Sequence, residues 1–467
     1  MNIPPASPAH ALDHWLKLVL VRARRVRADE APARLHRLRV ALRTVHTLAR
    51  AYRAMDTHRC WRQLARMVRE VLRELNAPRN WDVLLPLARR LAGERKDALC
   101  GWLKARTRGK SSAVRRALAG LPVETLRELR ARCVRRASRL PAGHPAFAHL
   151  TLEALVYSRR LQRAAMQSGE PPAYHALRIA LKRFRYQLEA FLPGLALRWE
   201  DELRLVQSIL GELQDLQTLR DAVQSPGCPL SPQRRSAWLA RIDAEVQQGI
   251  RRYNEAACSD RDLPGTWRRE FPRGAHLRRA AVQRIEAAAR LADPAFEQTP
   301  PLLDLAQHLR ARLGELHGDP VFTGEDAADL LACATLVLGL KRDSRGRPKG
   351  KRSARTARRL HAPLGLGAAN LKQASLVARF SGGALPSAAH KHFQALAPSA
   401  QQQVAALAAV LRLARLLHET DNAEARLLGG PGGMVLEGIK ARTGSNPWRR
   451  ALRALHTVLH CDVTLRV

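Results

Sequence analysis

A basic helical stripe occurs twice in this chain, and this repeat restricts the possible folds more than any other feature. The segment HRLRVALR at residues 36–43 returns as HALRIALK at residues 175–182. Residues three and four apart share one face of an α-helix, so each segment presents cations on one side and apolar side chains on the other. The cationic side carries His36, Arg39, Arg43, His46 and Arg50 in the first copy, and His175, Arg178, Lys182, Arg185 and then Glu189 in the second.

The opposite side of each segment is apolar. It consists of Leu38, Ala41, Leu42, Val45, Leu48 and Tyr52 in the first copy, and of Leu177, Ala180, Leu181, Phe184, Leu188 and Phe191 in the second. This periodicity predicts two amphipathic α-helices that each bury one face. Their cations follow one another at steps of roughly 5 Å, the axial rise of three to four residues. Such spacing fits a repeating polyanion better than a single small ligand.

The charge balance of the whole chain also indicates an anionic partner. The 467 residues include 80 Lys and Arg against 41 Asp and Glu, which gives a net charge of +39. A surplus of this size is typical of proteins that bind nucleic acid, inorganic polyphosphate or an anionic membrane surface. Aromatic residues make up only 4% of the chain. Because single-strand binders stack bases on aromatic side chains, this favours a partner without bases.

Cysteine usage and the N-terminal residues predict a cytoplasmic protein. The seven cysteines are scattered and none forms a C-x-x-C pair, so we expect reduced, mostly buried thiols. The first ten residues are rich in proline and lack the pattern of a signal peptide. The longest apolar run, Leu330–Leu340, is too short to span a bilayer, so no membrane partner is expected.

Almost the whole chain has helical character, with Leu, Ala and Arg dominant and few β-branched alternations. Breakers such as Gly169-Glu170-Pro171-Pro172 divide it into segments of about 15 to 25 residues, as in helical bundles with short connections. Each stripe is followed by a second helix that ends in a related turn, LNAPRNWD at 75–82 and LGELQDLQ at 210–217. We therefore predict an all-α fold that begins with duplicated antiparallel helical bundles.

Changes in composition predict the domain borders. Proline and glycine residues between Cys258 and Gly274 indicate a boundary, with domains at residues 1–262 and 276–467. The segment Lys341–Arg359 combines many cations with Gly and Pro, and we expect it to be a mobile basic loop. After the glycine-rich run 429–433, we expect small strands at Val435–Ile439 and Cys461–Val467, so the second domain ends in a small mixed tail.

The two H-x-L-R-[V/I]-A-L-[R/K] helices with their turns resemble the CHAD domain, the histidine α-helical domain, over roughly residues 8–260. The resemblance implies twin helical bundles whose basic faces line a groove that binds inorganic polyphosphate. The residues that it implicates are His36, Arg39 and Arg43 in the first copy, and His175, Arg178, Lys182 and Arg185 in the second. The chain departs from the family at Asn76 and Asn80, where the family turn usually has Gly and Asp.

Residues 276–467 resemble the C-terminal, HD-like helical domain of the exopolyphosphatase/guanosine pentaphosphatase family. The matching stretches are ARFSGGALP at 378–386, HKHF at 390–393 and LAAVLRLA at 407–414. In that family the domain assists a separate ATPase-like catalytic domain, which has no counterpart in this sequence.

This second resemblance breaks down where an HD fold would bind a metal. The chain has Leu338-Gly339-Leu340-Lys341 where His-Asp would stand, and Arg415 where a further Asp would stand. A metal centre of this kind needs His and carboxylate ligands, whereas Lys and Arg place positive charge there. We therefore expect no metal, no cofactor and no enzymatic activity.

The predicted polyphosphate site extends beyond the two stripes, because further arginines share helical faces and Arg suits bidentate contacts to phosphate oxygens. The full predicted set is His36, Arg39, Arg43, Arg50, Arg66, Arg69, Arg73, Arg79, His175, Arg178, Lys182, Arg183 and Arg185. A secondary anion site is predicted at Arg379, His390 and Lys391, with helix capping as the alternative role. Each stripe could instead be a solvated basic face, and each stripe histidine a hydrogen-bonded residue of the bundle seam.

Together these patterns predict an inorganic polyphosphate-binding protein, an accessory or granule-associated factor in the cytoplasm. A polyphosphate-metabolising enzyme is a compatible protein partner. Two alternatives stay open. The first is a nucleic-acid-binding protein, whereas under the main interpretation nucleic acid is only an electrostatic competitor. The second is an HD-type phosphohydrolase that acts on polyphosphate or an alarmone.

Overall fold

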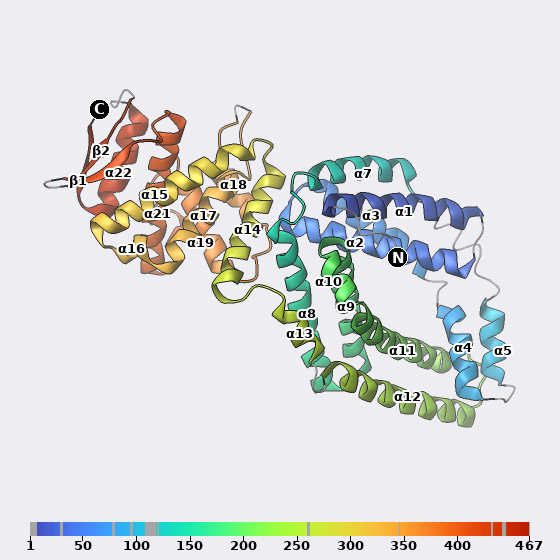
Figure 1. Ribbon diagram of the computed structural model, residues 1–467. Helices are drawn as coiled ribbons and strands as arrows, with labels where there is room; N and C mark the ends of the chain where they lie inside the picture. The colour runs from blue at the N-terminus through green and yellow to red at the C-terminus, as the bar shows by residue number, and fades with distance from the viewer. Residues whose placement is uncertain are drawn as a thin grey trace. The chain divides into compact units, whose positions relative to one another are not determined.

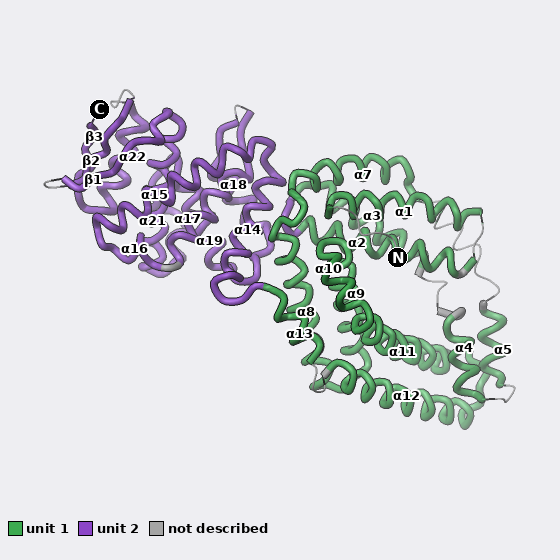
Figure 2. The backbone as a smooth tube through the Cα atoms, viewed as in Figure 1, with its two compact units in different colours: residues 1–53, 58–271 green, residues 54–57, 272–467 purple. Residues whose placement is uncertain are grey.

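The computed structural model describes residues 7–28, 31–76, 80–93, 97–107, 118, 121–258, 262–344, 346–430, 433–440 and 445–466. The chain divides into two compact units (Figure 2). Unit 1 comprises residues 1–53 and 58–271, and unit 2 comprises residues 54–57 and 272–467. The elements are α-helices apart from a 3₁₀ turn and a small sheet near the C-terminus, which confirms the predicted all-α class with a small mixed tail.

Unit 1 consists of packed α-helices of 6 to 27 residues (Figure 1). Its helices are α1 (Pro8–Ala28), α2 (Pro32–Met55), α3 (Arg59–Asn76), α4 (Asn80–Ala92), α5 (Ala98–Thr107), α7 (Val123–Ala137), α8 (Pro145–Ser168), α9 (Pro171–Phe191), α10 (Pro193–Arg198), α11 (Glu200–Gln224), α12 (Pro232–Cys258) and α13 (Leu263–Arg269). Gly169 ends α8 with a left-handed φ of 65°, and two prolines then begin α9. The helix α9 packs against α8 and α11, and α11 also packs against α12 and α4.

The two predicted stripes lie on α2 and α9, and their apolar faces are buried as predicted. Tyr52 of α2 stacks on Trp61 of α3 with ring centroids 4.6 Å apart. The same ring makes edge contacts with Phe147 of α8 at 6.1 Å and with Phe191 of α9 at 6.0 Å. This aromatic cluster joins the two stripe helices to one core, so their polar faces are held in fixed positions.

Unit 2 combines helices around an Ala- and Leu-rich core with a three-stranded sheet. Its elements are α14 (Gly274–Ala292), η1 (Phe296–Gln298), α15 (Thr299–His317), α16 (Pro320–Thr323), α17 (Glu325–Leu338), α18 (Gly350–Ala357), α19 (Ala368–Phe380), α20 (Lys391–Gln394), α21 (Pro398–Glu419), β1 (Arg426–Gly430), β2 (Gly433–Glu437), α22 (Asn446–Leu459) and β3 (Asp462–Arg466). β2 is the central strand, antiparallel to β1 and parallel to β3. α19 packs against α17, α18 and α21.

Two predictions for unit 2 were wrong in part. The segment Lys341–Arg359, predicted as a loop, contains the helix α18. The buried Ser353 of α18 anchors this segment, since its hydroxyl donates to the Leu338 carbonyl at 3.0 Å and accepts from the Lys341 backbone N–H at 3.1 Å. The tail also has the strand β1, which the sequence did not predict because glycines occupy its end. Within the described ranges, no helix is long and apolar enough to cross a membrane.

Candidate anion-binding groove

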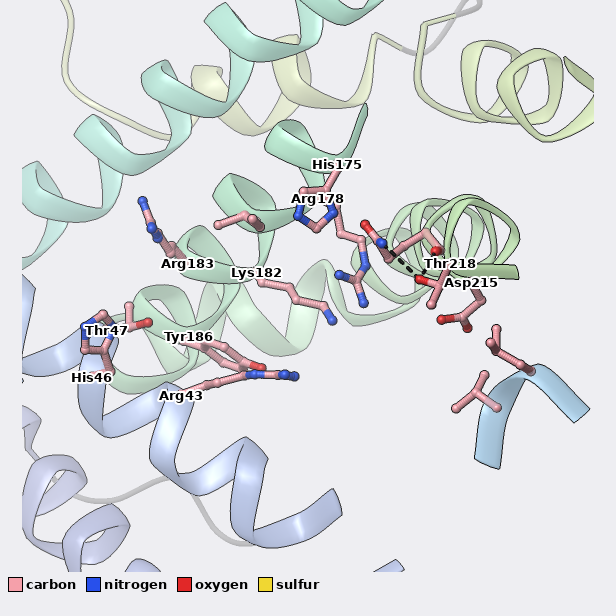
Figure 3. A pocket seen from close by; sticks show the side chains of 14 residues that line it. Arg43, His46, Thr47, His175, Arg178, Lys182, Arg183, Tyr186, Asp215 and Thr218 are labelled. Carbon is pink, nitrogen blue, oxygen red and sulfur yellow. Dashed lines mark hydrogen bonds between the residues drawn. The ribbon is translucent and has the colours of Figure 1, made fainter. Parts of the chain in front are cut away.

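Unit 1 contains a cavity of about 370 Å³ between α2, α4, α9 and α11 (Figure 3). We call this cavity the basic groove. Its cations are Arg43, Arg178, Lys182 and Arg183, and its histidines are His46 and His175. The other lining residues are Thr47, Val83, Leu84, Ile179, Tyr186, Gln214, Asp215 and Thr218. Asp215 is thus the one carboxylate among the described residues that line the groove.

The stripe pattern explains how α9 forms one wall of the groove. His175, Arg178 and Lys182 follow one another at intervals of three and four residues, so they share one side of the helix. Figure 3 shows Arg178 and Lys182 extended into the space that faces α11, with Arg43 of α2 close to Tyr186. The burial of the apolar side of α9 directs these cations into the groove rather than into the core.

The equivalent arginines of the two repeats, Arg39 and Arg178, are both buried, with exposed fractions of 5% and 7%. Their side chains nevertheless have different contacts. Arg39 does not line the groove, and its guanidinium donates through Nε, at 3.0 Å, and through Nη2 to the backbone carbonyl of Leu75. Leu75 lies in the last turn of α3, where carbonyls lack a partner within the helix. Arg39 therefore connects α2 to α3, whereas Arg178 faces the groove.

The histidines of the groove are uncharged at neutral pH. Burial, followed by the charges of Arg50, Arg183 and Arg69, lowers the pKa of His46 to about 4. The pKa of His175 is also lowered, first by burial and then by the two cations that follow it along α9. An anion in the groove would favour the protonated form of both rings, because an opposite charge raises the pKa of a histidine.

Tyr186 adds a neutral hydrogen-bond donor to this charged surface. Burial raises the pKa of its hydroxyl, and the nearby Arg43 and Arg185 oppose the shift only in part. The hydroxyl is therefore protonated at neutral pH and can donate to an anion. On the opposite side, Thr218 of α11 donates to the Gln214 carbonyl at 2.8 Å.

The structure brings together part of the predicted site. The predicted residues that line the groove are Arg43, His175, Arg178, Lys182 and Arg183. Those that are exposed and do not line it are His36, Arg50, Arg66, Arg69 and Arg73. Arg185 also lies outside the lining and donates to Glu189 at 2.7 Å and to Gln207 at 2.8 Å. Arg79 falls outside the described residues.

Several groove residues were not in the predicted set. His46 and Thr47 of α2, Ile179 and Tyr186 of α9, and the contributions of α4 and α11 were all omitted. For His46 the signal was present, because it continues the first stripe three positions after Arg43. Gln214 and Asp215 fall in the segment 210–217, which was predicted as a turn, but the structure places this whole segment inside the helix α11. Nothing in the sequence placed it opposite α9.

The predicted secondary anion site lies in unit 2. Arg379 and His390 line a second cavity there, whereas Lys391, the first residue of α20, is exposed and outside its lining. In the part of the chain that the structure describes, no group of three or more His, Cys, Asp or Glu side chains is placed to hold a metal ion.

Comparison with known proteins identifies the first part of unit 1. The sequence profile of the CHAD domain matches residues 9–224, so this segment is a CHAD domain. A crystal structure of the CHAD domain from the plant Ricinus communis is similar to this chain, with 22% identity and a TM-score of 0.42, and the match covers 58% of this chain and 94% of that one. No curated protein matches the chain. The comparisons do not support the exopolyphosphatase resemblance of residues 276–467, which stays a prediction.

Proposed function

We propose that the CHAD domain of this chain binds inorganic polyphosphate in the basic groove. One observation carries this proposal: cations from both repeats converge on a single cavity, Arg43 from α2 and three further cations from α9. Along α9, Arg178 and Lys182 are four residues apart, an axial separation of about 6 Å, and Arg183 follows Lys182 directly. A chain of closely spaced phosphates can contact several of them at once, which a monovalent anion cannot do. The family resemblance implies the same ligand.

Binding in this groove is multivalent and electrostatic. The arginines offer planar, bidentate contacts to phosphate oxygens, and Lys182 offers a point charge. Each neutralised phosphate releases its condensed counterions, so affinity depends on salt. Asp215 repels phosphate on the α11 side. The polyphosphate chain therefore follows the side of the groove formed by α2 and α9.

Calorimetric titration with long-chain polyphosphate tests the proposal. The groove variant is Arg43→Gln/Lys182→Gln/Arg183→Gln, and its matched control is Arg135→Gln/Arg234→Gln/Arg251→Gln. The control removes the same charge from exposed positions of unit 1 outside the groove. We expect at least about tenfold weaker binding in the groove variant, a cost of about 1.4 kcal/mol or more. The control should bind almost as tightly as the wild type.

Two results would contradict this proposal. Equal losses in the groove variant and its control would mean that the overall positive charge, rather than the groove, holds the polymer. Equal affinity for polyphosphate and for DNA of the same charge would instead favour the nucleic-acid alternative. Tyr186, the aromatic side chain among the described lining residues apart from the histidines, is only 7% exposed, so the groove offers little surface for stacking a base, which argues for polyphosphate.

We further infer that unit 2 is a degenerate HD-like domain without phosphohydrolase activity. Arg415, at the position where the resemblance would place an Asp, pairs with Glu419 at 3.1 Å and donates to the Ser381 hydroxyl at 3.4 Å. Lys341, at the expected His-Asp position, is exposed. Phosphate release from polyphosphate should stay at background with and without Mg²⁺ or Mn²⁺. Release that requires the metal would overturn this inference.

We also place the protein in the cytoplasm on polyphosphate granules, with a polyphosphate-metabolising enzyme as its partner. The positive charge of the chain supports attraction to such granules. A fluorescent fusion should follow the granules in cells, and the groove variant should disperse. A wild-type fusion that does not co-localise with the granules would contradict this placement.

A further inference from the structure

Unit 2 contains a second basic cavity, and its residues come from a part of the chain that the CHAD domain does not include. This cavity, of about 640 Å³, lies at the start of α18, at the end of α19 and along the segment that follows α19. We call it the unit 2 pocket. The cations that line it are Lys349, Lys351, Arg352, Arg379 and Arg415, with His390 beside them. No carboxylate occurs among its described lining residues.

The walls of the unit 2 pocket are built by close backbone contacts. A Cβ atom at Gly350 would lie 2.6 Å from the Ala378 carbonyl, so glycine is required for α18 to approach α19 this closely. The buried Arg412 donates to the carbonyls of Phe380, at 2.8 Å, and Gly383, at 3.0 Å. Arg412 thereby fixes the segment after α19. The pocket is therefore formed before any ligand arrives.

The beginning of α18 adds to the positive charge of the pocket. Gly350, Lys351 and Arg352 are the first three residues of this helix, and all three line the pocket. The N–H groups of a first helical turn carry partial positive charge and attract anions. Here they coincide with side-chain cations on the same wall.

The charges of the pocket are only partly compensated. Lys349 lies 3.6 Å from Asp343, and Arg415 pairs with Glu419. For Lys351, Arg352 and Arg379, no carboxylate lies within salt-bridge distance in the described ranges.

The positive charge near the pocket also affects the pKa of the exposed His392. Its pKa is lowered chiefly by Arg358, with further contributions from burial and from neighbouring cations that include Arg379. Positive charge at this end of unit 2 therefore exceeds what the local carboxylates neutralise.

We propose that the unit 2 pocket binds an inorganic oligophosphate, either a free short chain such as tripolyphosphate or the end of a longer polyphosphate. The three uncompensated cations can each contact a different phosphate group of such a chain, and the start of α18 adds a further contact. The aromatic lining residue, Phe380, is only 2% exposed and is covered by the rings of His390, at 4.9 Å, and Phe393, at 5.8 Å. The described lining thus offers a nucleobase no exposed Phe, Tyr or Trp ring for stacking. This assignment does not rest on the function proposed for the basic groove.

Titration of the full chain with tripolyphosphate tests the assignment. All proteins carry the groove variant, so that the remaining binding reports on unit 2. The pocket variant adds Lys351→Gln/Arg352→Gln/Arg379→Gln, and its matched control adds Arg426→Gln/Arg449→Gln/Arg453→Gln, exposed cations of unit 2 outside the pocket. We expect the control to keep the site and the pocket variant to bind at least about tenfold more weakly. Equal affinities would overturn the proposal.

Chemical footprinting of the wild type gives a second measurement that does not depend on any variant. Tripolyphosphate should slow the acetylation of Lys349 and Lys351 and leave the exposed Lys440 of the same unit unchanged. Equal protection of all three lysines, or none, would overturn the assignment. ATP that protects better than tripolyphosphate would overturn the inorganic ligand.

Long-chain polyphosphate then distinguishes the two sources of the ligand. Competition with tripolyphosphate in the groove-variant background identifies a chain end as the ligand, and lack of competition identifies a free oligophosphate. The groove proposal fails on a separate result. It fails if the groove variant keeps its affinity for long chains when the three pocket substitutions of unit 2 are also present.

Discussion

The salt dependence of polyphosphate binding measures how many cations of the basic groove contact phosphate. The groove has four permanently charged residues, Arg43, Arg178, Lys182 and Arg183, and its two histidines are uncharged at neutral pH. Each neutralised phosphate contributes about −0.7 to −0.9 to the slope of log affinity against log salt. Four contacts give a slope of about −2.8 to −3.6, so a threefold increase in salt weakens binding by about 20- to 50-fold.

Removing two of these cations should halve the slope. For Arg43→Gln/Lys182→Gln we expect a slope of about −1.4 to −1.8, and a threefold increase in salt then costs only about five- to sevenfold in affinity. The assay is calorimetric titration with long-chain polyphosphate over a series of NaCl concentrations. Both proteins carry the three pocket substitutions of unit 2, so that this site adds nothing to the slope.

Two results would contradict a groove in which four cations contact phosphate. A double variant that binds more weakly but keeps the full slope would show that Arg43 and Lys182 support the groove without contacting phosphate. A wild-type slope steeper than about −6 would require more contacts than the groove offers. Binding would then be spread over the surface of a chain with a net charge of +39. Either result would refute the count of contacts derived from the structure.

Three further predictions concern the residues around the groove. Tyr52→Ala should destabilise unit 1 by about 3–5 kcal/mol in urea unfolding, because it removes the centre of the aromatic cluster, and a loss below about 1 kcal/mol would contradict that role. Arg39→Met should lower the free energy of unfolding by about 1.5–3 kcal/mol, because it removes the charged hydrogen bonds to Leu75, and it should leave the salt slope of polyphosphate binding almost unchanged. A slope reduced as in the groove variants would show that Arg39 contacts the ligand. Polyphosphate should raise the pKa of His46 above its value of about 4, so binding takes up protons and tightens as the pH falls from about 6.5 towards 4. Calorimetry in buffers of different ionisation enthalpy measures this uptake, and an uptake that is unchanged in His46→Gln would refute the assignment.

The sequence predicted the elements that local periodicity determines. The apolar side of each stripe is buried, from Leu38 to Tyr52 in α2 and from Leu177 to Phe191 in α9. The breaker at Gly169 ends α8 as predicted, because only glycine adopts a left-handed φ without strain. At these positions the local conformational preference of the residues agrees with the tertiary packing.

Tertiary packing determined the features that the sequence pattern did not predict. Basic composition with Gly and Pro predicted a loop over Lys341–Arg359, yet the hydrogen bonds of the buried Ser353 hold the helix α18 against neighbouring segments. Similarly, the spacing of the stripes shows which residues share a face but not what that face meets. The groove residues of α4 and α11 could not be predicted because they depend on which helices pack opposite α9.

The two stripes contribute unequally to the groove, and the geometry of the bundle explains the asymmetry. Arg39 and Arg178 occupy the same position in the repeated motif, but the end of α3 lies against Arg39 and takes its hydrogen bonds. The first stripe therefore supplies only its later residues, Arg43 and His46, whereas the second supplies every groove cation and histidine between His175 and Arg183. Beyond that point Arg185 is engaged by Glu189. The two copies of the repeated sequence therefore contribute unequally to one site. In the first copy the buried arginine is bound by the end of α3, whereas in the second copy the equivalent arginine faces the groove.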